Sequence, residues 1–341
     1  MSLSIEEFDY FLPKELIAQF PEEERTSSRL LVLRREPLGI EHRYFRDIVE
    51  YVKAGDVLVL NNTRVLPARL RATRPTGGQV EILLVEELSG TTWSCLVKGL
   101  KKNVREQRLG IGSAPVILRR RAGTWEIEFS GEGGAWEIMK THGRMPLPPY
   151  IRRGKDGAAS CDVERYQTVY ASTLGSIAAP TAGLHFSQEL LEELRLKGVT
   201  VVYVTLHIGI GTFLLIKKGK VEDHEMHREW YKIDAEVVET ITKAQHSGGR
   251  VIAVGTSAVR TLETFFSRED MPLSGYTDLF IYPGYRFKVV NMFLTNFHLP
   301  RSTPLLLTSA FAGKENLLAA YKAAIEKSYR FYSYGDAMLI Q

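Results

Sequence analysis

The stretch that decides the fold is Gly248-Gly249-Arg250-Val251-Ile252-Ala253-Val254-Gly255-Thr256-Ser257-Ala258-Val259-Arg260-Thr261-Leu262-Glu263-Thr264-Phe265-Phe266. Residues 251–254 are a short, unbroken apolar run, which predicts a strand buried on both faces. Gly255 begins a turn. Residues 258–266 then have helical spacing, with Ser257 as the predicted N-cap. The stretch therefore predicts a strand–turn–helix corner in an α/β sheet.

Such a corner is suited to binding an anion. The first N–H groups of a helix have no partner inside the helix, and the helix dipole adds positive charge at this end. Arg260 follows in the first turn and could donate two hydrogen bonds to one carboxylate or phosphate. Thr256, Ser257 and Arg260 are therefore candidate binding residues, although an ordinary strand–helix corner that binds nothing has the same pattern.

Length and composition limit the class of protein. A chain of 341 residues predicts two domains, or one large domain with an insertion. Its 44% apolar and 25% charged residues are typical of a globular protein. No apolar run reaches the roughly 18 residues of a membrane helix, and the N-terminus lacks the pattern of a secretory signal. With only Cys95 and Cys161, we expect a cytoplasmic protein.

The middle of the chain differs from both flanks. Residues 66–150 contain short, partly alternating apolar runs, many separated by Gly or Pro, which predict a small β-barrel. From about residue 160 onward, strands alternate with helices, as in a doubly wound sheet. The predicted fold is α/β: a doubly wound, mostly parallel sheet domain of residues 1–65 and 151–341, interrupted by an inserted small β-barrel domain of residues 66–150.

Basic side chains are frequent in the predicted barrel: Lys98, Lys101, Lys102, Arg105, Arg108, Arg119, Arg120 and Arg121. The net charge of +4 is mild, so clustering matters more than the sum. If this face binds anything, a phosphate backbone is the natural candidate. A surface that only keeps the protein in solution explains the pattern equally well.

A second strand end carries polar groups. Residues 56–60 predict a strand, and Asn61, Asn62 and Arg64 follow it. Ligands of open α/β sheets bind beyond the carboxyl ends of the strands, so these three residues are candidate ligands of a substrate. The two asparagines could instead only satisfy the backbone of a turn.

Several histidines lie in or beside predicted loops. His185 ends a loop of small residues, His207 begins a Gly-rich loop, and His298 lies between an apolar run and a proline. Together with His224 and His227, these histidines suggest a metal site. However, no acids or cysteines cluster with them in the sequence, and the His-Glu-x-x-His pattern is missing. We therefore expect no metal. Proton transfer suits an imidazole better, because it titrates near neutral pH.

Six motifs together resemble one family. They are NNTRVLPAR (61–69), AAPTAGLHF (178–186), TLHIGIGTF (205–213), GRVIAVGTSAVRTLE (249–263), TNFHLP (295–300) and YGDAM (334–338). Over essentially its whole length the chain resembles the S-adenosylmethionine:tRNA ribosyltransferase-isomerases of queuosine synthesis. One departure is Asn291, where the family pattern has Asp, so a carboxylate there is dispensable or is supplied by a nearby acid such as Asp278.

The resemblance implies an unusual reaction. S-adenosylmethionine gives its ribosyl carbons to the amine of 7-aminomethyl-7-deazaguanine at the wobble position of tRNA, and epoxyqueuosine-tRNA, adenine and methionine are formed. The sulfonium acidifies the C5′ hydrogens and makes methionine a good leaving group. The resemblance implies no metal or other cofactor, because S-adenosylmethionine is the ribosyl donor. It also implies an α/β domain interrupted by a β-barrel.

This chemistry suggests roles for the motif residues. His185, His207 and His298 are candidates for proton transfer, with Asp278 as an orienting or accepting acid. Thr256, Ser257 and Arg260 are candidates for binding the methionyl carboxylate or a tRNA phosphate. Asn61, Asn62, Arg64 and Asn296 are candidates for binding the base or the ribose hydroxyls.

Two alternatives from other classes remain open. The chain could be a non-catalytic tRNA-binding module that uses the basic barrel. It could also be an S-adenosylmethionine methyltransferase, although the usual Gly-rich loop with an acid after the next strand is not evident. Release of adenine separates the expected enzyme from both alternatives. We expect the protein to act as a monomer and to contact no membrane.

Overall fold

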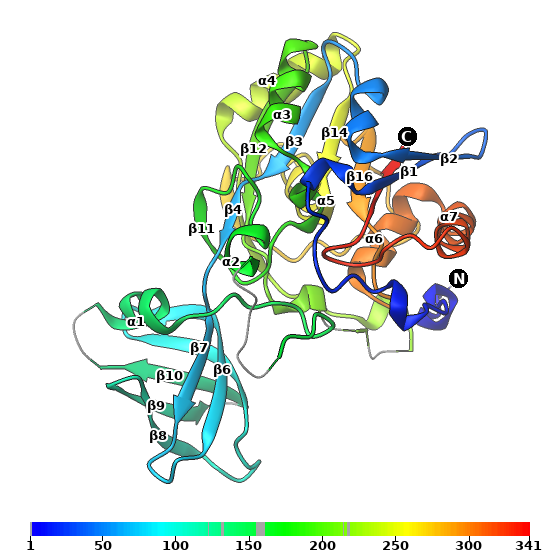
Figure 1. Ribbon diagram of the computed structural model, residues 1–341. Helices are drawn as coiled ribbons and strands as arrows, with labels where there is room; N and C mark the ends of the chain where they lie inside the picture. The colour runs from blue at the N-terminus through cyan, green and yellow to red at the C-terminus, as the bar shows by residue number, and fades with distance from the viewer. Residues whose placement is uncertain (1, 122, 131–132, 155–160, 214, 217–218) are drawn as a thin grey trace.

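The structure is a computed structural model that describes residues 2–121, 123–130, 133–154, 161–213, 215–216 and 219–341. Figure 1 shows an α/β domain, which contains both termini, and a β-barrel that projects from one side of it. The barrel is formed by the middle of the chain, between strands of the α/β domain. No helix within the described residues is long and apolar enough to cross a membrane.

Nine strands of the described residues form the sheet of the α/β domain, in the order β15-β13-β12-β3-β14-β16-β17-β1-β2. Their bounds are β1 Arg29–Arg34, β2 Gly39–Tyr44, β3 Val57–Asn61, β12 Thr200–Leu206, β13 Glu229–Lys232, β14 Val251–Val254, β15 Ser274–Thr277, β16 Met292–Asn296 and β17 Ala337–Ile340. The central strands β12, β3, β14 and β16 are parallel. In the register of these four strands, Val201 is paired with Leu58, Leu58 with Ile252, and Ile252 with Met292.

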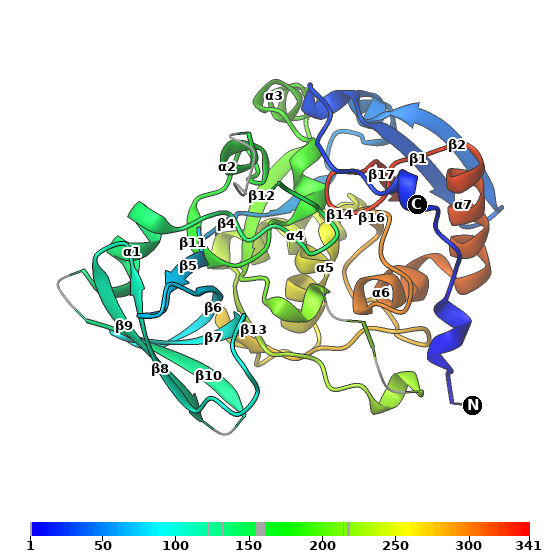
Figure 2. The same ribbon diagram turned by 60° about the horizontal axis from the view of Figure 1, so that its bottom comes forward.

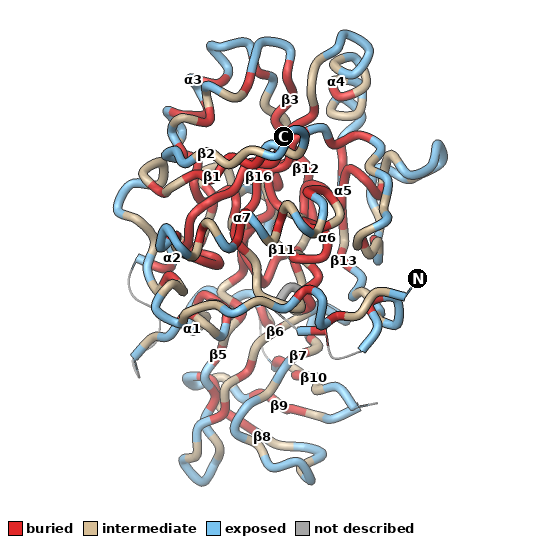
Figure 3. Tube along the Cα trace, turned by 90° about the vertical axis from the view of Figure 1, so that its right-hand side faces the viewer, coloured by how far each residue is buried: buried red, intermediate tan, exposed pale blue. Residues whose placement is uncertain are grey.

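Helices cover both faces of this sheet, so the predicted doubly wound architecture is confirmed (Figure 2). One face packs against α4 (Ala235–His246), α5 (Gly255–Phe265), α6 (Thr303–Ala312) and α7 (Lys314–Glu326). The other packs against α3 (Gln188–Leu196) and the 3₁₀ helix η4 (Phe45–Tyr51). Side chains alternate along a strand, so Leu31 and Leu33 of β1 pack on the first face of the sheet, whereas Leu30 and Val32 pack on the second. Figure 3 shows the buried residues concentrated on these strands and on α5.

The predicted barrel is also confirmed. Six strands of the described residues close in the order β10-β7-β6-β5-β8-β9. They are β5 Arg69–Thr73, β6 Gln79–Ser89, β7 Thr92–Lys98, β8 Glu106–Ile111, β9 Ala114–Arg121 and β10 Thr124–Phe129. Helix α1 (Gly134–His142) packs Ile138 and Met139 against the interior of the barrel. The domain boundaries at 65/66 and 150/151 remain a prediction.

Shorter elements connect the two domains and the strands. A two-stranded parallel sheet of β4 (Thr63–Val65) and β11 (Thr173–Ser176) and the short helix α2 (Asp162–Arg165) lie between the barrel and the main sheet (Figure 1). The remaining 3₁₀ helices of the described residues are η1 Ile5–Phe8, η2 Lys14–Leu16, η3 Arg25–Ser27, η5 Thr181–His185, η6 Ile210–Phe213 and η7 Val221–Asp223.

An ion pair holds together the N-terminal ends of β3 and β14. Asp56 is 0% exposed and precedes β3, whereas Arg250 precedes β14. Asp56 Oδ1 accepts from the backbone N–H and from Nε of Arg250, both at 3.1 Å, and Oδ2 accepts from Nη2 at 2.5 Å. Burial raises the pKa of Asp56, but the hydrogen bonds from Arg250 and from the Lys53 N–H outweigh burial, so that this pKa lies below its usual value.

We expect Asp56→Asn to lower the free energy of unfolding by about 1–3 kcal/mol at pH 7, because Arg250 loses a charged acceptor. The folded pKa of Asp56 is lowered, so the contribution of the carboxylate is present above about pH 4 and is lost as the pH falls through the folded pKa. Urea unfolding followed by circular dichroism at several pH values measures both effects.

The matched control is Asp234→Asn, because the Asp234–Lys232 pair is exposed. This control should change stability by about 0.5 kcal/mol or less. Equal losses for the two variants would contradict a special role for the pair at the strand ends.

Candidate active site

A pocket lies where the central parallel strands end. It is lined by Leu206 at the end of β12, by Gly255 after β14, and by Thr295 and Asn296 at the end of β16. It encloses about 950 Å³ of empty space, its open mouth included. This volume suits a small-molecule ligand, and the carboxyl edge of the strands is where such ligands bind in open α/β sheets.

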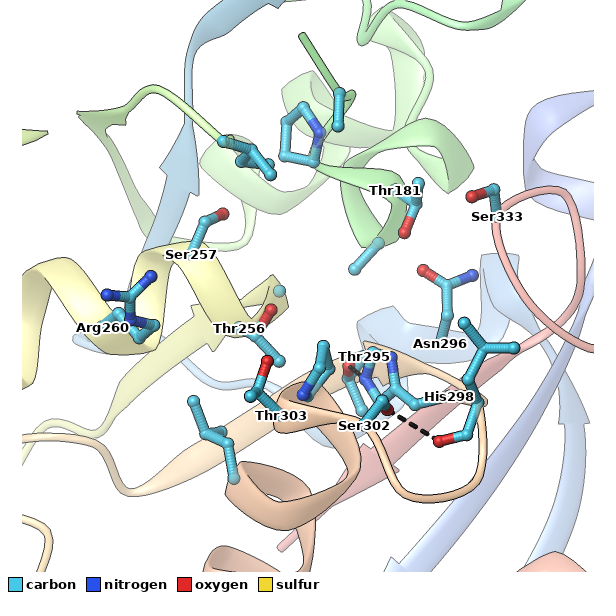
Figure 4. A pocket seen from close by; sticks show the side chains of 18 of the residues that line it. Thr181, Thr256, Ser257, Arg260, Thr295, Asn296, His298, Ser302, Thr303 and Ser333 are labelled. Atoms are coloured by element: carbon cyan, nitrogen blue, oxygen red, sulfur yellow. Dashed lines mark hydrogen bonds between the residues drawn. The ribbon is translucent and has the colours of Figure 1, made fainter. Parts of the chain in front are cut away.

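Part of the predicted site lines this pocket. Figure 4 shows Thr256, Ser257, Arg260, Asn296 and His298 around one open space, together with Thr181, Thr303 and Ser333. The other predicted residues do not line it: Asn61, Asn62, Arg64, His185, His207 and Asp278. The structure therefore separates a set of pocket residues from a set with other surroundings.

The start of α5 faces the pocket. The helix begins at Gly255, so the prediction that Ser257 is the N-cap is wrong. Gly255 has a φ of 82°, a conformation that strains a residue with a Cβ. The hydroxyl of Ser257 instead accepts a hydrogen bond from Asn61 Nδ2 at 2.9 Å. The N-cap residue, Val254, makes no side-chain hydrogen bond to the helix, so the first N–H groups are available to a ligand at its positive end.

The guanidinium of Arg260 is not free to bind a ligand, because each of its three nitrogens donates a hydrogen bond to an acceptor in the protein. Its Nη1 donates to the carboxylate of Glu229, its Nε donates to Leu279 O at 3.1 Å and its Nη2 donates to Thr277 O at 3.3 Å. Arg260 and Glu229 are each only 5% exposed. Glu229 also accepts from the Gly209 N–H at 2.8 Å. The pair thus fixes one wall of the pocket.

Asp278 lies next to this ion pair without joining the pocket. The carbonyls of its neighbours Thr277 and Leu279 accept from Arg260, whereas the side chain of Asp278 is exposed. Its predicted role as a catalytic acid therefore finds no support in the geometry of the pocket.

Asn61 acts as a structural clamp. Its Nδ2 donates to Leu206 O at 3.0 Å and to Ser257 Oγ, and its Oδ1 accepts from the N–H groups of Thr63 and Leu206 at 3.0 and 3.1 Å. With both amide atoms occupied at 0% exposure, Asn61 has nothing left to offer a substrate.

Asn62 and Arg64 face other surroundings. Asn62 Oδ1 accepts from the Thr205 hydroxyl at 2.7 Å, and the residue lines a separate shallow groove with Tyr203 and Lys232. Arg64 is exposed on β4. Direct contact of either residue with a ligand in the main pocket is therefore not indicated.

The three candidate histidines have different surroundings. His298 lines the pocket, and its Nε2 is 2.7 Å from Thr295 Oγ1. Burial lowers the pKa of His298 to about 3, so the ring is neutral at pH 7. His207 lies outside the pocket, stacked on Trp230 with its Nδ1 2.8 Å from Thr63 Oγ1, and burial lowers its pKa to about 4.

His185 lies behind the pocket wall. Its Nδ1 is 2.7 Å from Ser28 Oγ, and its Nε2 is 3.1 Å from Asn296 Nδ2. Burial, with Arg25 and Arg330 nearby, lowers the pKa of His185 to about 3. Asn296 separates it from the pocket, and Asn296 Oδ1 has no hydrogen-bond partner within the described residues.

Sequence reasoning missed several pocket residues. Tyr150, at the end of the predicted insertion, hydrogen-bonds through its hydroxyl to Ser333 Oγ at 2.6 Å, and its ring lies against Tyr332. The sequence feature that could have identified them is their position: Tyr150 ends the proline-rich run, and Tyr332 and Ser333 directly precede the YGDAM motif. Burial raises the pKa of Tyr150 to about 12 and also raises that of Tyr332. Both phenols are therefore protonated donors at pH 7.

The titratable residues of the described lining are few: Tyr150, Glu229, Arg260, His298 and Tyr332. Glu229 and Arg260 are committed to each other, and the two tyrosines keep their protons. His298 is the lining residue with an unprotonated nitrogen at neutral pH. No three His, Cys, Asp or Glu side chains gather into a metal-binding group in the part of the chain that the structure describes.

The chain is similar to known proteins over nearly its full length. The sequence model of a family described as queuosine biosynthesis protein matches residues 5–340. A solved crystal structure, that of S-adenosylmethionine tRNA ribosyltransferase from Thermotoga maritima, also matches, and its sequence is 39% identical to that of this chain. The match covers 98% of this chain and 100% of that one, with a TM-score of 0.57.

We expect Glu229→Leu to lower the free energy of unfolding by about 3–5 kcal/mol, because it leaves the buried guanidinium of Arg260 without a counter-charge. The double variant Glu229→Leu/Arg260→Met removes both charges and should recover most of that loss. Urea unfolding of the two variants and the wild type measures the difference. A double variant less stable than Glu229→Leu would show that the pair itself stabilises the wall.

Proposed function

The chain belongs to the queuosine biosynthesis protein family, and we propose that it is an S-adenosylmethionine:tRNA ribosyltransferase-isomerase with its active site in the pocket at the ends of β14 and β16. It transfers and isomerises the ribosyl group of S-adenosylmethionine onto 7-aminomethyl-7-deazaguanine at the tRNA wobble position. The products are epoxyqueuosine-tRNA, adenine and methionine. The observation that carries this proposal is the likeness, at 39% identity over 98% of the chain, to a structure of that ribosyltransferase.

The charges of the pocket suggest how the donor binds. The uncapped start of α5, at Thr256 and Ser257, offers backbone N–H groups and a positive dipole end to the methionyl carboxylate. Asn296 Oδ1 offers an acceptor nearby. S-adenosylmethionine acts as a substrate in this scheme, and the residues of the pocket are proposed to work without a cofactor.

His298 is our candidate for the base. The reaction needs a group that accepts a proton from C5′, whose acidity the adjacent sulfonium increases. His298 is unprotonated at pH 7 and lines the pocket, although its lowered pKa makes it a weak base. The departing adenine needs a proton donor, and the protonated hydroxyls of Tyr150 and Tyr332 line the same space.

The barrel is our candidate for contact with the tRNA backbone. Arg119 and Arg121 are paired with glutamates, so the argument rests on exposed neighbours: Lys98, Lys101, Lys102, Arg105 and Arg108. Binding to phosphates through such residues should weaken as salt is added. We further propose that the protein acts as a monomer, in the cytoplasm with its tRNA substrate.

Product analysis tests the proposed function. The protein, S-adenosylmethionine and tRNA carrying 7-aminomethyl-7-deazaguanine should yield adenine and methionine together, and only with the modified tRNA. Mass spectrometry detects both products. S-adenosylhomocysteine in place of adenine would indicate a methyltransferase, and salt-sensitive tRNA binding without adenine release would indicate a non-catalytic tRNA-binding module.

Among the candidate histidines, His298→Ala should have the largest effect. We expect turnover to fall by roughly 10²–10⁴-fold with little change in S-adenosylmethionine affinity, because a base is lost but no binding group. His207→Ala is the matched control, since this ring lies outside the pocket and should leave turnover within a few fold. Single-turnover adenine release and calorimetric binding measure the two quantities. Undiminished turnover of His298→Ala would eliminate His298 as the base.

A further inference from the structure

We propose that Arg228, Trp230 and Tyr276, which we call the edge patch, bind unpaired bases of the tRNA anticodon loop by stacking. This inference rests on the proposed function, because it takes tRNA as the partner. It deepens that function by naming an RNA contact on the α/β domain, in addition to the one proposed for the barrel.

The edge patch lies on the two strands at one end of the sheet. β15 is the terminal strand, and β13 lies next to it. Trp230 of β13 is directly opposite Tyr276 of β15 in their antiparallel register. Residues that are opposite each other project from the same face of a sheet, so the two rings are neighbours. The guanidinium carbon of Arg228 lies 5.3 Å from the centre of the Tyr276 ring, so the cation is on this face as well.

Packing of the core does not account for these rings. Glu229, the residue before Trp230, pairs with Arg260 of α5 on one face of β13, so Trp230 points to the opposite face. In the part of the chain that the structure describes, neither Trp230 nor Tyr276 belongs to a hydrophobic core cluster. Tyr276 is 53% exposed, and Trp230 is partly exposed. Contiguous exposed rings of this kind are typical of an interaction surface.

His207 fixes the ring of Trp230. The two rings are stacked, with centroids 5.0 Å apart and planes at 21°. His207 is in turn held by Thr63 of β4, whose Oγ1 is 2.8 Å from His207 Nδ1. The indole is therefore ordered before any partner binds, which lowers the entropic cost of binding. His207, a predicted proton-transfer residue, thus supports the edge patch from behind.

The chemistry of the edge patch fits single-stranded RNA. Every nucleobase has a flat aromatic face, and proteins bind unpaired bases by stacking them on Tyr and Trp rings. Arg228 makes no ion pair with a carboxylate among the described residues, so its charge is available to a phosphate. Paired bases in a stem are stacked on one another and do not offer their faces. An RNA loop is therefore favoured over a stem.

The position of the edge patch suits the anticodon loop. Leu206 and Ile208 line the pocket, whereas His207 between them is stacked on Trp230. In the same way, Glu229 lines the pocket and Trp230 beside it does not. Pocket and edge patch therefore lie on opposite faces of the same two strands, at the carboxyl end of β12. A loop that passes over this end can place its wobble base in the pocket and neighbouring bases on the edge patch.

RNA binding without S-adenosylmethionine tests the edge patch, because no reaction then follows binding. The probes are a stem–loop RNA with 7-aminomethyl-7-deazaguanine in its anticodon loop and a duplex RNA of the same length. Wild type should prefer the stem–loop. Tyr276→Ala should bind the stem–loop roughly 5- to 100-fold more weakly than wild type and the duplex equally well. Tyr276→Phe keeps the ring and should bind both RNAs like wild type. Tyr276→Thr replaces the alanine variant if that one does not fold.

Tyr44→Ala is the matched control. Tyr44 is 49% exposed, and the guanidinium carbon of Arg46 lies 5.1 Å from the centre of its ring. However, Tyr44 belongs to β2, at the opposite end of the sheet. This variant should leave both Kd values unchanged. Equal losses for Tyr44→Ala and Tyr276→Ala would overturn the assignment of the edge patch.

Stacking itself is tested by combining the variant with altered RNA. An abasic nucleotide is placed in turn at each loop position near the wobble base. At one position it should weaken binding by wild type about as much as Tyr276→Ala does. The same RNA should cause little further loss in Tyr276→Ala, because the stacking partner is already missing. Additive losses at every position would overturn the stacking role.

The charge of Arg228 is tested by the salt dependence of binding. Arg228→Gln should reduce the slope of log Kd against log salt concentration by roughly 0.7–1, the effect of losing one phosphate contact. Arg46→Gln is the control and should leave the slope unchanged. An unchanged slope for Arg228→Gln would remove this residue from the RNA contact.

The remaining outcomes separate this inference from the proposed function. Absence of adenine release by wild type with modified tRNA would contradict the proposed function itself. Adenine release by wild type, with unchanged stem–loop affinity of Tyr276→Ala, would overturn only the edge patch. Wild type that binds the duplex as tightly as the stem–loop would overturn it too. A change in sedimentation of Tyr276→Ala without a change in RNA affinity would assign the patch to contact with a second copy of this chain.

Discussion

The pocket depends on the side-chain amide of Asn61, which ties together three chain segments at the carboxyl edge of the sheet. It joins the end of β3 to both backbone groups of Leu206 on β12 and to the hydroxyl of Ser257 in the first turn of α5. Because the amide is fully buried, each lost bond would leave a polar group without water. At the other end of the same strands, Asp56 and Arg250 hold β3 and β14 in line. The start of α5 is thereby aimed into the pocket.

Most of the ionic and polar groups around the pocket bind one another and so maintain the shape of the pocket. Glu229 and Arg260 neutralise each other inside one wall, and His185 supports another from behind. Among the described residues, the proposed mechanism uses few groups: the N–H groups of α5, Asn296 Oδ1, His298 and the hydroxyls of Tyr150 and Tyr332. A rigid frame with few free polar groups is what precise placement of a reacting substrate requires.

Local sequence patterns predicted the fold well, because its main signals are local. The apolar run before Gly255 and the short strands of the barrel are visible within about ten residues. The lining of the pocket was predicted only in part, since the partners of its residues are distant in sequence: Arg260 pairs with Glu229, Ser257 with Asn61 and His185 with Asn296. No spacing rule reveals which polar residue has already met such a partner. The family resemblance identified the motifs but could not separate pocket residues from their supports.

A crystal structure of the protein with S-adenosylmethionine tests the central claim most directly. We predict the methionyl carboxylate on the backbone N–H groups of Thr256 and Ser257, with a donor group of the substrate hydrogen-bonded to Asn296 Oδ1. S-adenosylmethionine bound elsewhere, such as in the groove beside Asn62 and Tyr203, would contradict the account. So would a reversed pose with the adenine at the start of α5.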